Sequence, residues 1–487
     1  MLIAQDIDVD VVVVGGGPAG LHAALEAARH GKHVVLIDEE PDVGGACVRR
    51  GTIPSKTLRE TAISLEMVGR KSAGVVELAL PDDTALASLL SRTREVVSAH
   101  ERTWAKHLHA AGVHVMHGRA RFTVDDGDHC ILVQTVRRER YKVRAASIVL
   151  ATGSRPRTPD NVPIDHETIL DSDSILSLPW LPKSLIVLGG GVIATEYAAI
   201  FASLGVEVVC VDRAPRPLGF LDPEIVAAYL RAFADNGGSF IGGRSVATVE
   251  HEPGKVCVTL DDGRVLRADK LLCALGRVAN VETLHLEAIG LATDARGLLV
   301  VDEHHQTALP HILAVGDVIG PPSLASTSME QGRRAGRVAC GLGHSSSTPL
   351  VPVGVYAIPE MAAIGLSEAD ARAKNIACVV GRASFADTAR GVIAASEGGL
   401  LKLVASADGQ RILGVQIVGE GAAELVHLGQ LAMLGGLSPQ VFVEQAFNFP
   451  TMAEAYRIAA LEIAGLIGEE DLHSFETGDP VVEAWPI

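Results

Sequence analysis

The chain has 487 residues, and its 59 acidic side chains outweigh 42 basic ones to give a formal net charge of −17. At ~100–200 residues per domain this length predicts two to four domains, and the 48% hydrophobic content excludes a disordered chain. The negative charge and the 4% aromatic content disfavour a nucleic-acid binder, which needs basic grooves and stacking rings. Because Gly is abundant at 50 residues, we expect bound phosphates to be held by backbone N–H groups and helix ends.

The N-terminal region predicts a dinucleotide-binding unit. An apolar strand over residues 10–14 leads into a glycine turn and a predicted helix over residues 21–30. The turn carries a G-x-G-x-x-G fingerprint, formed by Gly15, Gly17 and Gly20. The first glycine makes the turn, the second admits a pyrophosphate, and the third lets helix and strand pack closely. A second strand, 33–38, ends at Asp38, where a carboxylate can bind ribose hydroxyls.

A long amphipathic helix is expected over residues 83–111, and a strand over residues 113–118 follows it. The fingerprint pattern then recurs after an apolar strand over residues 184–188, and its three positions are Gly189, Gly191 and Ala194. A predicted helix over 195–204 and a strand over 206–212 complete this second unit, which ends at Asp212. Two dinucleotide sites in one chain indicate electron transfer between two cofactors.

The cysteines argue against metal or disulfide scaffolds. There are seven, with no C-x-x-C pair, so we expect no zinc site and no secreted disulfide framework. The adjacent His304 and His305 have no third ligand at suitable spacing, and no metal is expected there. No apolar run reaches the ~18–20 residues of a membrane span. The N-terminal stretch lacks the basic region of a signal peptide, and the expected location is cytoplasmic.

Residues 44–56 (Gly-Gly-Ala-Cys-Val-Arg-Arg-Gly-Thr-Ile-Pro-Ser-Lys) resemble the FAD-dependent pyridine nucleotide–disulfide oxidoreductases. Further marks of that family stand in order at residues 151–153, 274–277, 314–317 and 450–454. The resemblance, which spans residues from about 8 to about 466, implies an α/β fold of the glutathione reductase kind. It implies a homodimer whose subunits have two Rossmann-like dinucleotide-binding domains and a C-terminal α+β dimerisation domain. The implied domains are an FAD domain at 1–155 and 278–347, an NAD(P) domain at 156–277, and a dimerisation domain at 348–487.

The resemblance also assigns cofactor contacts. The expected FAD contacts are the first fingerprint, Asp38 and eight further positions. These are Gly45, Lys56, Ala120, Thr152, Gly153, Gly316, Asp317 and Ala325. Asp317 would bind the ribityl hydroxyls, and a helix beginning near Ala325 would point its positive end at the flavin. The expected contacts of NAD(H) or NADP(H) are the second fingerprint together with Glu196, Asp212, Arg213 and Gly276. Lys56 and Glu196 match an ion pair beside the flavin, and Tyr197 matches a residue that covers the flavin when nicotinamide is absent.

Two departures from the family pattern bear on the chemistry. The disulfide reductases carry a second thiol five positions after Cys47, where this chain has Thr52. They also place a general-base histidine where this chain has Phe449, although its usual carboxylate partner remains as Glu454. A dithiol relay needs both the thiolate and the base, so we expect no redox-active disulfide. Thr52 is expected to pack against the flavin ring, and Cys47 is either a structural thiol or a redox group.

One branch of the family shows the same changes. The soluble pyridine nucleotide transhydrogenases resemble this chain at residues 51–56 and 447–456, and the resemblance implies hydride transfer from one nicotinamide nucleotide to another in a ping-pong cycle. Asp212 favours NAD(H), whereas Arg213 and Arg216 could accommodate the 2′-phosphate of NADP(H). An NAD(P)H:acceptor reductase that reduces a quinone or dye, and a flavoprotein without turnover, remain alternatives. The acidic tail, 468–487, departs from the transhydrogenase pattern. Its alternative roles are a docked terminus, a cap over the active site and a subunit contact.

Overall fold

A computed structural model describes residues 5–71, 86–343, 350–396 and 398–467 of the chain. The tail at 468–487 therefore lies outside the described residues. Contacts divide the chain into two compact units. Unit 1 is drawn from residues 1–62, 80–191 and 246–348, and unit 2 from residues 63–79, 192–245 and 349–487. Among the described residues, no helix is long and apolar enough to cross a lipid bilayer.

Unit 1 is built on a sheet of six strands, which are β1 (Gln5–Val14), β2 (Val34–Asp38), β3 (His114–Asp125), β4 (Asp128–Thr135), β5 (Arg140–Leu150) and β16 (Ile312–Ala314). The strand β1 lies between β2 and β5 and is parallel to both, with Val13 opposite Leu36 on one side and Val149 on the other. β4 pairs in antiparallel fashion with β3 and β5. The apolar end of β1 is almost completely buried, as expected for a parallel strand covered on both faces.

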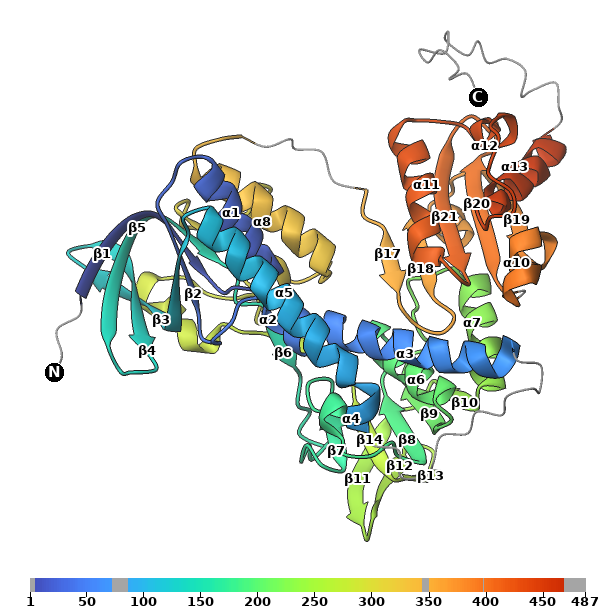
Figure 1. Ribbon diagram of the computed structural model, residues 1–487, viewed down its shortest axis with the longest axis horizontal. Helices are drawn as coiled ribbons and strands as arrows, with labels where there is room; N and C mark the ends of the chain where they lie inside the picture. The colour runs from blue at the N-terminus through green and yellow to red at the C-terminus, as the bar shows by residue number, and fades with distance from the viewer. Residues whose placement is uncertain (1–4, 72–85, 344–349, 397, 468–487) are drawn as a thin grey trace. The chain divides into compact units, whose positions relative to one another are not determined.

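Two helices pack side by side in unit 1, α1 (Pro18–Arg29) and α8 (Ala325–Ala339), as Figure 1 shows. The start of α8 confirms the helix expected near Ala325. α1 begins at Pro18, earlier than expected, because proline suits the first turn of a helix. The helix expected over 83–111 is interrupted at Leu90 into α4 (Leu86–Leu89) and α5 (Ser91–Ala110), and residues 83–85 lie outside the described ranges.

The rest of unit 1 contains two further helices, short strands and 3-10 turns. The helix α2 (Gly45–Arg49) precedes α3 (Thr52–Lys71), which begins in unit 1 and continues into unit 2. The strand β14 (Lys270–Cys273) is parallel to both β8 (Ser184–Leu188) and β7 (Ile169–Asp171). Three antiparallel strands form a small sheet, β11 (Val246–Glu252), β12 (Lys255–Leu260) and β13 (Val265–Ala268). The strands β6 (Ser154–Pro156) and β15 (Arg277–Ala279) form an antiparallel pair. Four 3-10 turns are η1 (Ile175–Ser177), η2 (Glu282–Leu284), η3 (Leu286–Ile289) and η4 (Gly316–Ile319).

The part of unit 2 at residues 192–245 contains, in chain order, α6 (Val192–Ser203), β9 (Glu207–Asp212), α7 (Pro223–Asp235) and β10 (Gly238–Gly242). β9 and β10 are parallel, so this stretch has the strand–helix–strand form expected of a dinucleotide-binding fold. The helix expected over 195–204 starts earlier, at Val192.

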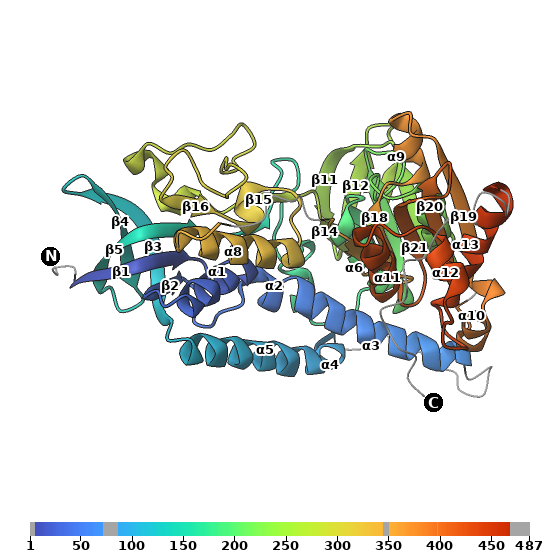
Figure 2. The same cartoon turned by 90° about the horizontal axis from the view of Figure 1, so that it is seen from above.

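The C-terminal part of unit 2 is an antiparallel five-stranded sheet in the order β17-β18-β21-β20-β19. Its strands are β17 (Val353–Val355), β18 (Met361–Gly365), β19 (Cys378–Ser384), β20 (Leu400–Ser406) and β21 (Ile412–Val418). Its helices are α9 (Glu368–Ala373), η5 (Phe385–Asp387), α10 (Ala389–Ala394), α11 (Ala422–Leu434), α12 (Gln440–Glu444) and α13 (Glu454–Ile467). α13 lies along β19 and β20, whereas α11 lies along β21 and β18 (Figure 2). Parallel strand–helix units together with an antiparallel α+β region confirm the predicted α/β fold class.

Candidate functional site

The turn between β1 and α1 is shaped to receive a phosphate. Gly15 has a φ of +104°, and a Cβ atom there would collide with the carbonyl oxygen of Ala151. Beside Gly17 the space is open, since the nearest atom to a Cβ would be the Cα of Gly45, 3.9 Å away. The N-cap residue of α1 is Gly17, which has no side chain to cap the helix, so the N–H groups of the first turn face this open side.

Asp38 lies at the end of β2, next to that turn. Its Oδ2 accepts a hydrogen bond from the N–H of Gly16 at 2.5 Å, and its Oδ1 accepts one from the N–H of Glu40 at 2.8 Å. Burial raises the pKa of Asp38, and these two N–H groups partly oppose that shift. The structure therefore brings Asp38 together with the fingerprint, where the sequence places a ribose-binding carboxylate.

Three residues predicted for the flavin site lie around the thiol of Cys47. Cys47 is half-buried on α2 and makes no disulfide, as is true of all seven cysteines. Burial raises its pKa, while a hydrogen bond with Thr52 and the charge of Lys56 lower it in part and the charge of Asp317 adds to the increase. Cys47 is therefore a neutral thiol at pH 7.

Asp317 is held by a group that the sequence did not single out. The hydroxyl of Ser154 donates to its Oδ2 at 2.6 Å, and Arg277 Nε donates to the same hydroxyl at 2.8 Å. Nearby, Gly316 N–H donates to Gln331 on α8 at 2.8 Å. The N-terminus of α8 has no side-chain cap, so its positive end is available to an electron-rich ligand.

Thr152 has a buried hydroxyl oxygen for which the described residues provide no hydrogen-bond partner. Its backbone is held in place, because Asn280 Nδ2 donates to the Thr152 carbonyl at 3.0 Å and Asn280 N–H donates to the Gly153 carbonyl at 3.0 Å. Asn280 was missed at the sequence level, although it follows the family mark at 274–277 by only three positions. A buried polar atom without a partner points to a ligand that supplies one.

Other predicted residues lie on β3, on turns and on α6. Ala120 is buried on β3, opposite Val133. Gly276 has a φ of +106°, and its carbonyl accepts a hydrogen bond from the N–H of Arg157 at 3.0 Å. β8 leads directly into Gly189 and Gly191, and a Cβ at Gly191 would meet no atom within 4 Å. Ala194 is completely buried on α6, as close packing at the third fingerprint position requires.

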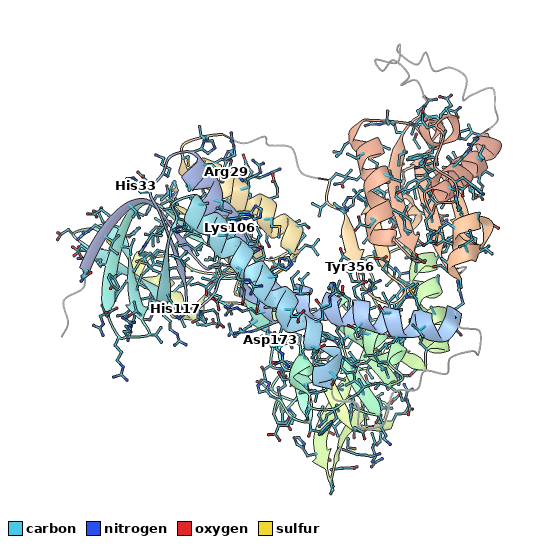
Figure 3. All side chains as sticks on the ribbon, viewed as in Figure 1. Arg29, His33, Lys106, His117, Asp173 and Tyr356 are labelled. Atoms are coloured by element: carbon cyan, nitrogen blue, oxygen red, sulfur yellow. The ribbon has the colours of Figure 1, made fainter. Side chains whose placement is uncertain are left out.

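In unit 2, Glu196 is a buried carboxylate on α6 with 5% of its surface exposed. Its Oε1 accepts a hydrogen bond from the N–H of Tyr356, labelled in Figure 3, at 2.8 Å. Tyr197 is also buried. Lys56 lies on the part of α3 that belongs to unit 1, so its ion pair with Glu196 stays a prediction.

Three arginines lie in the turns that follow β9 and β10. Asp212 Oδ1 accepts a hydrogen bond from Ala214 N–H at 2.6 Å, and Arg213 is exposed beside it. Arg216 donates to the Gly219 carbonyl at 3.2 Å. Arg244, which sequence reasoning missed, donates its N–H to the Asp212 carbonyl at 3.0 Å. Its position just after β10, a strand parallel to β9, is the signal that could have found it.

The C-terminal motif exposes an aromatic ring. Phe449 has 73% of its surface exposed, and Glu454 begins α13. The Oε2 of Glu454 is buried and has no hydrogen-bond partner within the described part of the chain. A search of the same residues finds no group of three or more His, Cys, Asp or Glu that could hold a metal ion.

Comparisons with known proteins place the chain among flavoproteins. Residues 9–332 match the sequence profile of the pyridine nucleotide-disulphide oxidoreductases, and residues 351–460 match the dimerisation domain of the same family. A soluble pyridine nucleotide transhydrogenase of Mycobacterium bovis BCG is 40% identical over 93% of this chain and 97% of its own length. A soluble pyridine nucleotide transhydrogenase of Pectobacterium atrosepticum is 39% identical over 95% of this chain and 98% of its own length. The crystal structure of LpdA from Mycobacterium tuberculosis has a TM-score of 0.86 at 27% identity and covers 93% of this chain and 100% of its own.

Proposed function

Because the chain belongs to the pyridine nucleotide–disulphide oxidoreductase family, we propose that it catalyses an FAD-dependent transfer of hydride between two nicotinamide nucleotides without a redox-active disulfide. As a member of this family it is an oxidoreductase that uses FAD and NAD(P)H and forms a homodimer through its C-terminal domain. In this proposal residues 1–155 and 278–347 hold FAD, residues 156–277 hold the nicotinamide nucleotide, and residues 348–487 form the dimer. The cytoplasmic location expected from the sequence stays a prediction.

The residues of unit 1 fit FAD. The open space beside Gly17 and the uncapped start of α1 suit a pyrophosphate. Asp38 suits the adenosine ribose, and Asp317 suits the ribityl chain. The buried Thr152 hydroxyl, which lacks a partner among the described residues, suits a polar ligand edge.

FAD, when bound, supplies a two-electron carrier that can accept and return a hydride. The chain itself contributes binding and electrostatics. The Lys56 ammonium supplies positive charge close to Cys47 and Thr52, and the uncapped N-terminus of α8 supplies a positive dipole end. The buried Glu196 and Tyr197 of α6 would lie on the nicotinamide side and exclude water.

The observation that carries the proposal is the Thr52 hydroxyl close to the Cys47 thiol. The family's disulfide reductases need a second thiol at that position, and here a hydroxyl occupies it. A hydroxyl cannot form a disulfide or exchange electrons with a thiol. Phe449 in place of the base adds independent support, since a phenyl ring cannot move a proton.

A second candidate, an NAD(P)H:acceptor reductase, is favoured by Asp212. A carboxylate at the end of β9 repels a 2′-phosphate, and a reductase of quinones or dyes has no need to accept both nucleotides. Arg213, Arg216 and Arg244 around the same strand end favour the transhydrogenase, because guanidinium groups bind phosphate well.

The deciding experiment mixes the purified dimer with NADPH and thio-NAD⁺ without oxygen and follows thio-NADH by its absorbance. Steady formation of thio-NADH is expected, and its absence while a quinone is reduced rapidly would favour the acceptor reductase. Turnover of lipoamide or glutathione disulfide would contradict the absence of a disulfide relay. Lys56→Met should slow the transfer, whereas Lys106→Met, an exposed lysine on α5, is the matched control.

A further inference from the structure

Three side chains of unit 1 form a directional chain of hydrogen bonds that ends on Asp317. Arg277 Nε donates to Ser154 Oγ at 2.8 Å, and Ser154 Oγ lies 2.6 Å from Asp317 Oδ2. An arginine can only donate, and a carboxylate can only accept. Because the serine hydroxyl has one proton and receives the arginine N–H, that proton must point to Asp317.

The chain of bonds is anchored at two neighbouring strands. Ser154 begins β6 and Arg277 begins β15, and the two strands are antiparallel with Ser154 opposite Ala279. Arg277 also donates from its second terminal nitrogen to the Ser154 carbonyl at 2.7 Å. This second bond fixes the guanidinium against the serine backbone, so the position of the hydroxyl is determined by the strand pair.

Ser154 uses only one oxygen of the Asp317 carboxylate. No described residue forms a hydrogen bond with Oδ1, so this oxygen remains available to a ligand hydroxyl. The unpartnered hydroxyl of Thr152 lies two residues before Ser154 in sequence, on backbone that Asn280 holds. Among the described residues, the Thr152 hydroxyl and Asp317 Oδ1 are therefore two polar groups without a hydrogen-bond partner, close to Ser154 in sequence or in space.

We propose that Ser154 and Arg277 are positioning residues for the flavin, and that they hold the Asp317 carboxylate so that Oδ1 can accept a ribityl hydroxyl. Arg277 also places a positive charge two hydrogen bonds away from Asp317, through the Ser154 hydroxyl. The inference depends on FAD use and not on the final electron acceptor, so it can fail while the proposed transhydrogenation holds.

The test measures FAD retention by the purified holoenzyme, from the free FAD that is separated by ultrafiltration across a dilution series. Ser154→Ala should raise the dissociation constant of FAD about tenfold, which corresponds to ~1.4 kcal/mol. Ser154→Thr keeps a hydroxyl and should restore affinity to within about twofold of the wild type. Ser147→Ala is the matched control, because that hydroxyl lies in the same unit and makes only a 3.5 Å bond to Ala339.

A double-mutant cycle distinguishes positioning from general support of the fold. In an Asp317→Ala background, Ser154→Ala should no longer change the dissociation constant, because the carboxylate on which it acts is gone. An equal tenfold loss in that background, or no loss in the single variant, would overturn the inference. If Ser154→Ala does not fold, Arg277→Met replaces it in the same cycle, with the same two outcomes.

Discussion

Replacing Lys402 tests the most deeply buried basic side chain that the structure describes in unit 2. Its side chain is 1% exposed, and its Nζ lies 2.9 Å from Asp222, 2.7 Å from Glu224 and 3.2 Å from Glu368. Burial lowers the pKa of Lys402, but the carboxylates, above all Glu224 and Asp222, outweigh burial and raise it. Lys402 is therefore charged at pH 7 and joins β20 to the start of α7.

The loss expected from Lys402→Met follows from what each carboxylate keeps. Glu224 and Glu368 retain Arg382, whose terminal nitrogen lies 2.7 Å and 2.8 Å from them. Asp222, with 1% of its side chain exposed, keeps only its capping bond from Glu224 N–H at 2.9 Å. Breaking a buried pair by removing one partner costs about 3–5 kcal/mol, so we expect the free energy of unfolding to fall by that amount at pH 7.

The assay is urea unfolding followed by intrinsic tryptophan fluorescence, with Lys106→Met as the exposed control (Figure 3). The control should change the free energy of unfolding by less than about 0.5 kcal/mol. Asp222→Asn removes the stranded charge and keeps an oxygen for the cap, so the double variant should recover part of the loss. A loss below about 1 kcal/mol in Lys402→Met, or no recovery in the double variant, would refute the reasoning.

Three further predictions concern pH, the thiol and nucleotide choice. Hydrogen bonds from Arg382 and, to a smaller extent, Lys402 lower the pKa of Glu224 from its usual 4.5 to about 2. The stability that ionised Glu224 contributes is therefore present above pH 4.5 and is lost as the pH falls towards 2. Calorimetric melting temperatures should therefore drop over that window, and less steeply in Glu224→Gln. Cys47→Ser should keep hydride transfer within about threefold of the wild type, because hydride transfer itself needs no thiol; loss of turnover would implicate the thiol. Arg213→Ala combined with Arg216→Ala should raise the KM for NADPH about tenfold, the effect of losing a charge-assisted hydrogen bond, and leave the KM for NADH unchanged. Equal changes in both constants would contradict a 2′-phosphate role for these arginines.

The fingerprints could be predicted from sequence because their logic is local. A buried strand, a glycine turn and a helix lie within one continuous stretch, so their residue types report the backbone directly. The structure accordingly begins α1 beside Gly17 and ends β2 at Asp38. The break at Leu90 was missed because both flanking segments are helical in pattern, and periodicity alone does not mark a one-residue interruption.

The polar networks could not be predicted in this way. Ser154 and Arg277 are 123 positions apart, and Lys402 meets Asp222 across 180 positions. Serine, lysine and arginine are ordinary surface residues by composition, and only the paired strands or the sheet packing bring them to their partners. Arg244 illustrates an intermediate case, since the parallel alignment of β10 with β9 would place it beside Asp212 once the topology is known.

Cys47 connects the sequence departures to the chemistry. A reactive thiol needs a lowered pKa, which positive charge or a helix N-terminus provides. Here burial raises the pKa of Cys47 despite Lys56, and the neighbouring group is the hydroxyl of Thr52. With Phe449 where the family's disulfide reductases carry a base, the thiol has no resolving partner and no proton acceptor at either family position. Hydride transfer requires neither group, so the proposed nucleotide-to-nucleotide reaction needs no disulfide relay. The variant Thr52→Cys tests whether these two positions can support a disulfide. The new thiol should form an oxidisable pair with Cys47, measured as a loss of two titratable thiols on mild oxidation. No loss of thiols would show that the two positions are not placed for a disulfide.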